Sequence, residues 1–442
     1  MDFAEARKYL LSLGNEVLAM KLGLENIRVL LAELGDPQDA YLKVQVAGTN
    51  GKGSVCAFLN SICLRAGIRT GMYTSPHLVS ITERVKIDGV DISEDDFAKF
   101  ATRVRETSET LVADGRITNI PTYFEQVTAI ALLAFAEAKV ELAILETGLG
   151  GRLDATTAAN AEIATITRID LDHQQYLGES LREIAAEKAA IIHAGSRVVV
   201  APQHRVAELV ISRRCAELNI EPVWATREIV TTTWEHVGYL AYTHSFRTGE
   251  NYYDRVDPLM LGRHQAENAA VAIAVAEILN EEFFEISGTE ICLGLETATH
   301  PGRLEFVDAF LLDGAHNTGG ARALRLFLDE SISRPIVMVF GSMNDKDIGA
   351  IAAALLPRAD RLVLTKPDNS RAIKAEDLLE FIPDDFDKKR VFITPNAAAA
   401  IEKAREVCGK QDVILVTGSL YLVGEVRRML TAEPPEKLKT DN

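Results

Sequence analysis

This 442-residue sequence lacks the marks of several protein classes. No stretch of about 18 consecutive apolar residues occurs, so no segment qualifies as a membrane-spanning helix. Basic residues are too few for a nucleic-acid partner, because 47 stand against 64 acidic ones and duplex binding needs basic stripes that neutralise phosphates. Cysteine is scarce and never arranged as C-x-x-C, which predicts neither a disulfide framework nor a zinc site at Cys56, Cys63, Cys215, Cys292 and Cys408.

What is present is the composition of an ordinary folded protein, with 47% hydrophobic and 25% charged residues. Because single cores stop growing at about 250–300 residues, the length predicts two domains, which we place at residues 1–297 and 298–442. Residues 1–14 have helical rather than signal-peptide character, and residues 431–442 read as a disordered tail. We therefore expect a cytoplasmic monomer with small-molecule substrates and with no nucleic-acid or membrane partner.

Short apolar runs alternate with helix-period stretches in the first part of the chain. Such a pattern predicts a parallel sheet with helices on both faces, and the runs are residues 43–47, 69–74, 142–147, 163–168 and 197–201. Residues 222–262 predict an antiparallel hairpin, and Gln265–Asn280 predicts a helix. A second α/β series follows His300, with strand-like runs that begin at residues 309, 335, 361, 390 and 412.

The stretch VAGTNGKGSV, residues 46–55, lies between the first predicted strand and a helix-like run. A glycine-rich turn that leads into a helix exposes backbone N–H groups and the positive end of the helix dipole, and both favour a phosphate. Lys52 adds a mobile positive charge. The match to G-x-x-x-x-G-K-[ST] is imperfect, because Val46 takes the first glycine position and Gly53 separates Lys52 from Ser54. An ordinary strand-to-helix turn is the alternative.

Three more loops after predicted strands carry side chains suited to catalysis. They are Thr74-Ser-Pro-His77, the segment from Glu146 to Asp154, and Asp170-Leu-Asp-His173. In open α/β sheets ligands bind beyond the carboxyl ends of the strands, so these loops should meet. Their hydroxyls, carboxylate and imidazole around a phosphate cradle suit Mg²⁺ and a nucleotide together.

Each of these residues also has a purely structural interpretation. A buried Glu146 needs either a cation or an arginine partner, for which Arg84 and Arg152 are candidates. A lone histidine after a strand, such as His173, is more often a surface or core residue than a metal ligand. Lys188, on a largely apolar helix, either extends its amine to solvent or is chemically tuned.

A series of motifs spans nearly the whole chain: VAGTNGKGSV (46–55), YTSPHL (73–78), TERVKIDG (82–89), TYFEQVTAIALLAF (122–135), LETGLGGRLDATT (145–157), IDLDHQQYLG (169–178), EKAAII (187–192), HPGRLE (300–305), LDGAHN (312–317), FGSMNDKD (340–347) and GSLYLVGEV (418–426). In type and order they resemble the folylpolyglutamate synthase/dihydrofolate synthase family, within the ATP-dependent Mur ligase superfamily. The resemblance implies an α/β chain with an N-terminal P-loop ATPase domain, which has a mainly parallel sheet and a small antiparallel region, and a C-terminal Rossmann-like domain.

The resemblance also implies an ATP site and a metal site. The catalytic residues would be Lys52, His173, Lys188 and His316, and the ATP contacts Thr49, Asn50, Gly51, Lys52, Gly53, Ser54, Asn268, Arg303, Asp313 and His316. Two Mg²⁺ ions are expected, one at Ser75 and Glu146 and one at His173 and Lys188, with Ser54 as a further metal residue. The family's lysine at this point is carbamylated, which turns a cation into a carboxylate-like group. The site would lie in a cleft between the domains.

Folate-binding residues are implied in the same way, at Leu22, Gly23, Leu24, Thr122, Tyr123, Phe124, Glu125, Arg152, Leu153 and Asp154. Phe124 is suited to cover a flat pterin ring, although a buried core phenylalanine explains it equally well. The departures from the family pattern are Thr147 in place of valine, Thr157-Ala-Ala159 in place of T-N, and Ala189-Ala190 in place of A-G. None removes a proposed ligand.

The reaction implied is transfer of the terminal phosphoryl group of ATP to a folate or dihydropteroate carboxylate, followed by attack of the glutamate amine on the acyl phosphate. Two rivals stay open. One is a Mur-type ligase that joins another amino acid to a cell-wall precursor. The other is a nucleotide-binding regulatory module without ligase activity, against which the set of Ser75, Glu146, His173, Lys188 and His316 argues.

Overall fold

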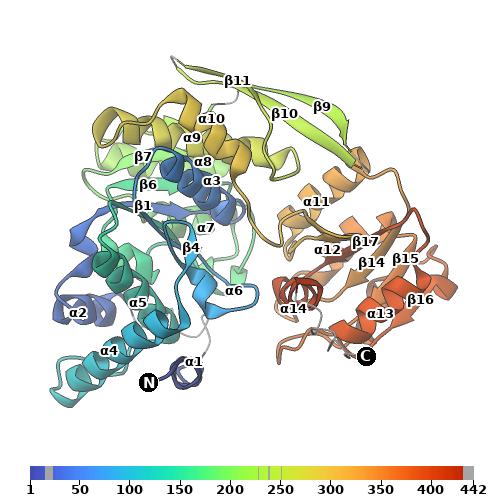
Figure 1. Ribbon diagram of the computed structural model, residues 1–442, viewed down its shortest axis with the longest axis horizontal. Coiled ribbons are helices and arrows are strands. Elements are labelled where there is room, and N and C mark those ends of the chain that lie inside the picture. The colour runs from blue at the N-terminus through green and yellow to red at the C-terminus, as the bar shows by residue number, and fades with distance from the viewer. Residues whose placement is uncertain (15–22, 227, 237–238, 250, 432–442) are drawn as a thin grey trace, which may run out of the picture. The chain divides into compact units, whose positions relative to one another are not determined.

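The computed structural model describes residues 1–14, 23–226, 228–236, 239–249 and 251–431 (Figure 1). Leu22 and nearly all of the predicted tail lie outside these residues. The chain forms two compact units. The first unit comprises Met1–Thr232, Tyr242–Leu259 and Arg263–Thr299, and the second unit comprises Thr233–Ala241, Met260–Gly262 and His300–Asn442.

The first unit is built on an eight-stranded sheet with the order β4-β3-β2-β5-β1-β6-β7-β8. All neighbouring pairs from β2 to β8 are parallel, whereas β3 and β4 join antiparallel at one edge. The predicted parallel sheet is thus confirmed. The strands are β1 (Leu42–Ala47), β2 (Thr70–Tyr73), β3 (Val85–Ile87), β4 (Val90–Asp91), β5 (Leu142–Glu146), β6 (Ile163–Ile166), β7 (Arg197–Val200) and β8 (Val223–Trp224).

Helices cover both faces of this sheet (Figure 1). On one face α3 (Lys52–Arg65), α9 (His264–Glu282) and α10 (Gly288–Thr297) pack together, and α9 confirms the predicted alanine-rich helix. On the other lie α5 (Tyr123–Ala138), α7 (Leu181–Ala189) and α8 (Arg205–Glu217). The remaining helices of the unit are α1 (Phe3–Ser12), α2 (Glu25–Glu33), α4 (Glu94–Ala113) and α6 (Gln174–Leu177), with short 3₁₀ turns at η2 (Pro37–Ala40), η3 (Ile81–Arg84) and η4 (Ala155–Ala159).

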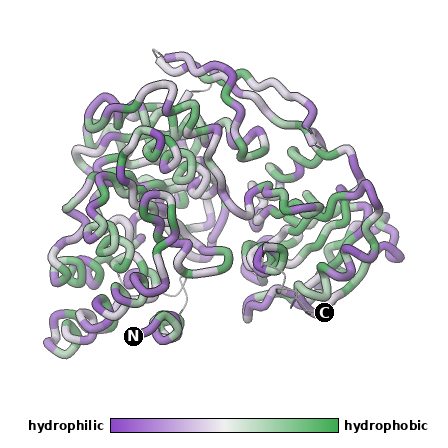
Figure 2. Tube along the Cα trace, viewed as in Figure 1, coloured by the Kyte–Doolittle hydropathy of each residue, from purple (hydrophilic) through white to green (hydrophobic). Residues whose placement is uncertain are grey.

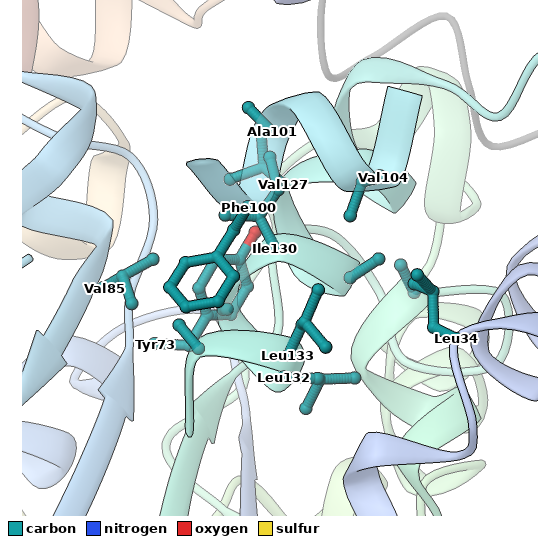
Figure 3. Packing of buried hydrophobic residues seen from close by; sticks show 14 of the residues in the cluster. Leu34, Tyr73, Val85, Phe100, Ala101, Val104, Val127, Ile130, Leu132 and Leu133 are labelled. Carbon is teal, nitrogen blue, oxygen red and sulfur yellow. The ribbon is translucent and has the colours of Figure 1, made fainter. Parts of the chain in front are cut away.

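The largest apolar cluster surrounds α5, whose residues Tyr123 to Phe135 are all buried. A helix that is apolar on every side needs neighbours all round, and α4, α2, α1 and the sheet supply them. Figure 3 shows Phe100 and Val104 of α4 converging with Ile130 and Leu133 of α5. This packing fixes the N-terminus of α5, where the side chain of Thr122 caps the helix.

The predicted antiparallel region is confirmed as a three-stranded sheet in the order β11-β10-β9. Its strands are β9 (Ile229–His236), β10 (Tyr239–Arg247) and β11 (Tyr252–Val256). Glu277 of α9 ties the turn between β10 and β11 to the helix, because its Oε1 accepts hydrogen bonds from Thr248 Oγ1, Asn251 Nδ2 and Tyr253 Oη at 2.8, 2.8 and 2.9 Å.

The second unit contains a six-stranded sheet with the order β12-β13-β17-β14-β15-β16, parallel except for β12. Its central strands are fully buried, and Figure 2 colours much of their trace as hydrophobic. The strands are β12 (Glu305–Val307), β13 (Phe310–Leu312), β14 (Ile336–Phe340), β15 (Arg361–Leu364), β16 (Val391–Ile393) and β17 (Val413–Thr417). The helices are α11 (Thr318–Ser331), α12 (Ile348–Leu355), α13 (Ala397–Val407) and α14 (Leu420–Thr431), with 3₁₀ turns η5 (Leu356–Arg358), η6 (Asp377–Phe381) and η7 (Lys388–Arg390).

A search of the described residues finds no helix that is both long enough and apolar enough to span a bilayer.

Candidate active site

The glycine-rich turn between β1 and α3 forms a tight loop, here called the phosphate loop (residues 48–54). Gly48 and Gly51 have φ angles of 155° and 90°, which L side chains rarely adopt. A Cβ atom on Gly48 would lie 1.8 Å from Oγ1 of Thr167, and one on Gly51 would lie 2.2 Å from Oδ1 of Asn268. The loop therefore needs glycine at both positions, and Asn268 of α9 lies directly beside it.

Only part of the phosphate loop has N–H groups available for an anion. The N–H groups of Thr49 and Asn50 both donate to the carbonyl oxygen of Arg168, at 2.9 and 3.2 Å. By contrast, Lys52, Gly53 and Ser54 form the first turn of α3, where N–H groups have no acceptor within the helix. The first turn of α3 therefore offers backbone donors suited to an anion, whereas the N–H groups of Thr49 and Asn50 already have an acceptor.

Ser75 and Glu146 meet at the carboxyl ends of neighbouring strands β2 and β5. Glu146 is only 5% exposed, and its Oε2 accepts a hydrogen bond from the backbone N–H of Ser75 at 3.1 Å. The Oγ atom of Ser75 is buried and has no hydrogen-bond partner among the described residues. A buried carboxylate beside an unsatisfied hydroxyl oxygen fits a hard divalent cation, for which oxygen ligands are preferred.

The two arginines considered as partners of Glu146 each have a described contact with another residue. Arg152 Nε donates to Glu187 at 2.9 Å, and Arg84 Nε donates to His77 Nδ1 at 2.8 Å. Within the described residues no group of three or more His, Cys, Asp and Glu side chains is arranged to hold a metal ion. A cation at Glu146 would therefore need hydroxyl, phosphate or water oxygens as its other ligands.

Lys188 joins α7 to the phosphate loop. Its side chain is 4% exposed, and Nζ donates a hydrogen bond to the carbonyl oxygen of Gly48 at 2.8 Å. Burial, reinforced by the positive charge of Lys52, lowers the pKa of Lys188 to about 7, although Asp172 acts in the opposite direction. This amine is far easier to deprotonate than an exposed lysine.

His173 is the N-cap residue of α6 and has a φ angle of 50°, in the left-handed region that residues other than glycine seldom occupy. Its backbone N–H donates to Oδ1 of Asp172 at 2.8 Å, and its Nε2 lies 3.9 Å from Oδ2 of the same carboxylate. Uncommon backbone conformations of this kind are found at functional sites more often than elsewhere.

Two aspartates of this loop, Asp170 and Asp172, are candidate site residues that the sequence does not single out individually. Asp172 contacts His173, and Asp170 accepts a hydrogen bond from Asn50 Nδ2 at 3.1 Å. Their signal in the sequence is the IDLDH motif directly after a buried strand.

The predicted folate segments lie around the start of α5. Thr122 and Glu125 form a reciprocal capping box, and burial raises the pKa of Glu125, whose Oε1 has no hydrogen-bond partner among the described residues. Phe124 is 7% exposed and packs against Tyr73, with ring centroids 6.0 Å apart. A Cβ on Gly148 would lie 2.4 Å from its ring, so the core interpretation of Phe124 has direct support.

Asp154 shapes its own loop. Its carboxylate accepts hydrogen bonds from the N–H groups of Gly148, Leu149 and Thr156 at 2.8, 2.9 and 3.0 Å, and from the Thr156 hydroxyl. Burial raises the pKa of Asp154, and these donors oppose that effect. Leu153 lies in the same loop, and Gly23 and Leu24 lead into α2; Leu22 is outside the described residues.

In the second unit three predicted residues gather at the carboxyl end of β13. Asp313 is 7% exposed and accepts hydrogen bonds from the N–H groups of Leu304 and Ala315, both at 3.0 Å. Burial raises the pKa of Asp313, while the nearby Arg303 acts to lower it. Arg303 Nη1 and His316 Nδ1 both donate to the carbonyl oxygen of Gly314, at 3.4 and 2.7 Å.

The predicted site residues thus form two groups, each within its own unit. In the first unit Lys188 and Asn268 lie beside the phosphate loop, which includes Thr49 and Asn50, and the backbone N–H of Ser75 donates to Glu146. In the second unit Arg303, Asp313 and His316 lie around Gly314.

Comparison with protein families gives two matches. Residues 46–276 match the Mur ligase middle domain, and residues 302–420 match the Mur ligase glutamate ligase domain.

Curated relatives cover almost the whole chain. A Bacillus subtilis dihydrofolate synthase/folylpolyglutamate synthase is 34% identical over 94% of this chain and 97% of its own length. A Halobacterium salinarum protein, named a probable bifunctional folylpolyglutamate synthase/dihydropteroate synthase, is 36% identical over 98% of this chain. The chain spans about half, 52%, of that relative.

Solved structures match over nearly their full length. A Mycobacterium tuberculosis folylpolyglutamate synthase complexed with ADP has a TM-score of 0.89 and 30% identity, covering 98% of this chain and 99% of its own. A bifunctional folylpolyglutamate synthase/dihydrofolate synthase from Yersinia pestis, complexed with AMPPNP and a Mn ion, has a TM-score of 0.82 and 31% identity, covering 97% and 98%.

Proposed function

This chain belongs to the folylpolyglutamate synthase/dihydrofolate synthase family of ATP-dependent, amide-bond-forming Mur ligases, and on that premise we propose that it joins L-glutamate to the carboxylate of a folate or of dihydropteroate. The cell-wall ligase is the less favoured reading, because the nearly full-length relatives act in the folate branch by name.

Two contacts carry the proposal. The backbone N–H of Ser75 donates to the carboxylate of Glu146, and Lys188 donates to Gly48 of the phosphate loop. Glu146 ends β5, which pairs with β1 so that Val46 and Glu146 are partners, and the phosphate loop follows β1 directly. This arrangement suits a metal–nucleotide complex, in agreement with the ADP and the AMPPNP with Mn ion named for two similar structures.

Each metal site has its own proposed ligands. We assign Ser54, Ser75 and Glu146 to one Mg²⁺ ion, and His173 and Lys188 to a second. When bound, the metal neutralises charge on the phosphates as the terminal phosphoryl group is transferred. Lys52 would supply a further positive charge at the start of α3, where the N–H groups of the first turn could donate to the phosphates.

The chemistry proceeds in two balanced steps. The substrate carboxylate attacks the terminal phosphorus of ATP, the bond to the bridging oxygen breaks, and an acyl phosphate and ADP result. The amine of glutamate then attacks the acyl carbon, phosphate leaves with the electrons of the carbon–oxygen bond, and the new amide loses the extra proton. Positioning and charge stabilisation carry both steps, so no protein nucleophile is needed.

Lys188 is proposed to carry a carbamate. Its amine is buried, hydrogen-bonded to Gly48 and readily deprotonated, which are conditions for attack on CO₂. A nitrogen–carbon bond forms, one carbon–oxygen π pair moves to oxygen, and the nitrogen gives up a proton. The product is an anion with two oxygen atoms, which makes it a metal ligand where an ammonium would repel a metal.

The other contacts follow the same premise. Thr49, Asn50 and Asn268 of the first unit and Arg303, Asp313 and His316 of the second are proposed ATP contacts. For the pterin we propose the segments Gly23–Leu24, Thr122–Glu125 and Arg152–Asp154. Within these, Asp154 acts through the shape of its loop, since its carboxylate is already occupied by backbone donors.

The deciding experiment measures phosphate release from MgATP with glutamate and either dihydropteroate or tetrahydrofolate, with mass spectrometry of the products. Products one glutamyl residue heavier support the proposal and assign the step. ATP binding without turnover on either acceptor, combined with turnover on a cell-wall precursor, would overturn it.

A further inference from the structure

Gln203 makes a pair of hydrogen bonds that nothing in the chemistry above explains. It lies in the loop between β7 and α8. Its Nε2 donates to the carbonyl oxygen of Thr167 at 2.9 Å, and its Oε1 accepts from the N–H of Ile169 at 3.1 Å. The pairing between β6 and β7 ends just before, where Ala201 N–H donates to Ile166 O at 2.8 Å. The side-chain amide thus continues the ladder beyond the end of β7.

The segment held by Gln203 (residues 167–170) also holds the phosphate loop. The carbonyl oxygen of Arg168, between the two bonds to Gln203, accepts the N–H groups of Thr49 and Asn50. Thr167 Oγ1 donates to the carbonyl oxygen of Asn50 at 2.8 Å. Thr49 Oγ1 donates to the carbonyl oxygen of Asp170 at 3.0 Å and accepts its N–H at 3.1 Å.

The order of contacts is therefore Gln203, then residues 167–170, then the phosphate loop. Gln203 makes one hydrogen bond on each side of Arg168, to Thr167 and to Ile169, and these bonds fix the orientation of the peptide group between them. In that orientation the carbonyl oxygen of Arg168 accepts two N–H groups of the phosphate loop. The same segment continues to His173 three residues later. An unconstrained segment would be free to rotate this carbonyl away, since residues 167–170 lie between named strands and helices.

We propose that Gln203 is a positioning residue that holds the phosphate loop in its nucleotide-binding conformation through residues 167–170. The inference deepens the proposed function, because it concerns the same nucleotide site. In the described contacts Gln203 touches neither the phosphate loop nor the proposed metal ligands. It acts through Thr167 and Ile169.

The first test replaces Gln203 with methionine, which keeps the length of the side chain and removes both hydrogen bonds. The KM for MgATP should rise about tenfold, since two hydrogen bonds of ordinary strength are lost, while the KM for glutamate stays unchanged. Gln411→Met is the matched control, because Gln411 is an exposed residue of the second unit, and it should leave both constants unchanged. Equal effects on the two KM values would contradict a positioning role.

Gln203→Glu adds a readout that a general loss of stability would not change. The carboxylate still accepts from Ile169 N–H but cannot donate to Thr167 O, and protonation restores that donor. The activity of Gln203→Glu relative to the native chain should therefore rise as the pH is lowered, whereas the ratio for Gln203→Met should stay flat. Parallel profiles for the two variants would count against the inference.

Hydrogen exchange separates this inference from the proposed function. In Gln203→Met the amides of Thr49 and Asn50 should exchange faster, while those of α9 and α11 keep their native rates. This measurement needs no substrate, so it decides the inference even if the native chain shows no ligase activity, a result that would refute only the proposed function. Unchanged exchange at Thr49 and Asn50 would overturn the inference.

Discussion

The side-chain amine of Lys188 donates a hydrogen bond to the carbonyl oxygen of Gly48 over 2.8 Å, between residues 140 positions apart in the sequence. The bond links the last turn of α7 to the first glycine of the phosphate loop. A lysine carbamate would keep one N–H, so the proposed modification is compatible with this bond and would add two oxygen atoms.

Lys188 should take up CO₂. In the presence of ¹³C-labelled bicarbonate at neutral or higher pH, where more of the amine is unprotonated, the native chain should show a carbamate carbon resonance. Lys188→Met should lack this resonance and lose at least about a hundredfold in phosphate release, because an anionic metal ligand is missing. Lys346→Met, in the second unit, is the control and should keep the resonance. A spectrum without a carbamate signal in the native chain would contradict the carbamate.

Gly51 should be required for nucleotide binding. An alanine there meets both a φ angle of 90° and the amide of Asn268, so Gly51→Ala should weaken ADP binding at least about tenfold in calorimetry.

Gly67→Ala is its matched control. Gly67 has a φ angle of 76° with no atom within 4 Å of an added Cβ, so the backbone strain is similar and the clash is absent. It should cost about 1 kcal/mol of unfolding free energy without changing ADP affinity. Equal ADP affinities for the two variants would show that contact with Asn268 is unimportant.

The Mg²⁺ concentration that phosphate release requires should depend on the charge of Glu146. Glu146→Gln removes the charge but keeps the shape, so the Mg²⁺ concentration that gives half-maximal phosphate release should rise at least about tenfold. Ser75→Ala should act in the same direction with a smaller effect, since a neutral ligand is lost. The control is Glu141→Gln, an exposed carboxylate just before β5. The assignment fails if Glu146→Gln responds to Mg²⁺ like the native chain.

Stability should fall in acid partly because of His244. Burial, and then the charge of Arg263, lowers the pKa of His244 to about 4, although Asp257 acts to raise it. An unfolded histidine titrates near 6.5. Between about pH 4 and 6.5 the unfolded chain therefore binds more protons than the folded one, so the unfolding free energy rises with pH, by up to about 1.4 kcal/mol per unit for this group.

His244→Phe removes that titration and keeps a buried ring beside Tyr242. Urea unfolding of the two proteins at pH 5 and pH 7 should show a smaller loss in the variant on acidification. The bond between His244 Nδ1 and Thr231 is also lost, which lowers stability equally at both pH values. Identical pH dependence in the two proteins would exclude the proposed role of His244.

The sequence reveals the elements of the fold because their signals are local. The apolar runs at 142–147 and 197–201 became β5 and β7, and the alternating segment near Tyr239 became β10. It also indicates the site, since residues after strand ends must meet at one edge of a parallel sheet. Gln203 gave no such signal: a glutamine in a loop is unremarkable until its two partners, Thr167 and Ile169, are known.

What the sequence determined by itself is the order of strands and helices along the chain, the glycine-rich turn before α3 and the set of candidate site residues. These follow from side-chain periodicity and from residue types within a few positions of one another. Only the tertiary structure decided that the N–H groups of Thr49 and Asn50 donate to the carbonyl oxygen of Arg168, that the carboxylate of Asp154 accepts hydrogen bonds from its own loop, and that Lys188 is buried against Gly48. Each of these depends on partners or burial set by folding, because a hydrogen bond or a shifted pKa is a property of the surroundings and not of the residue alone.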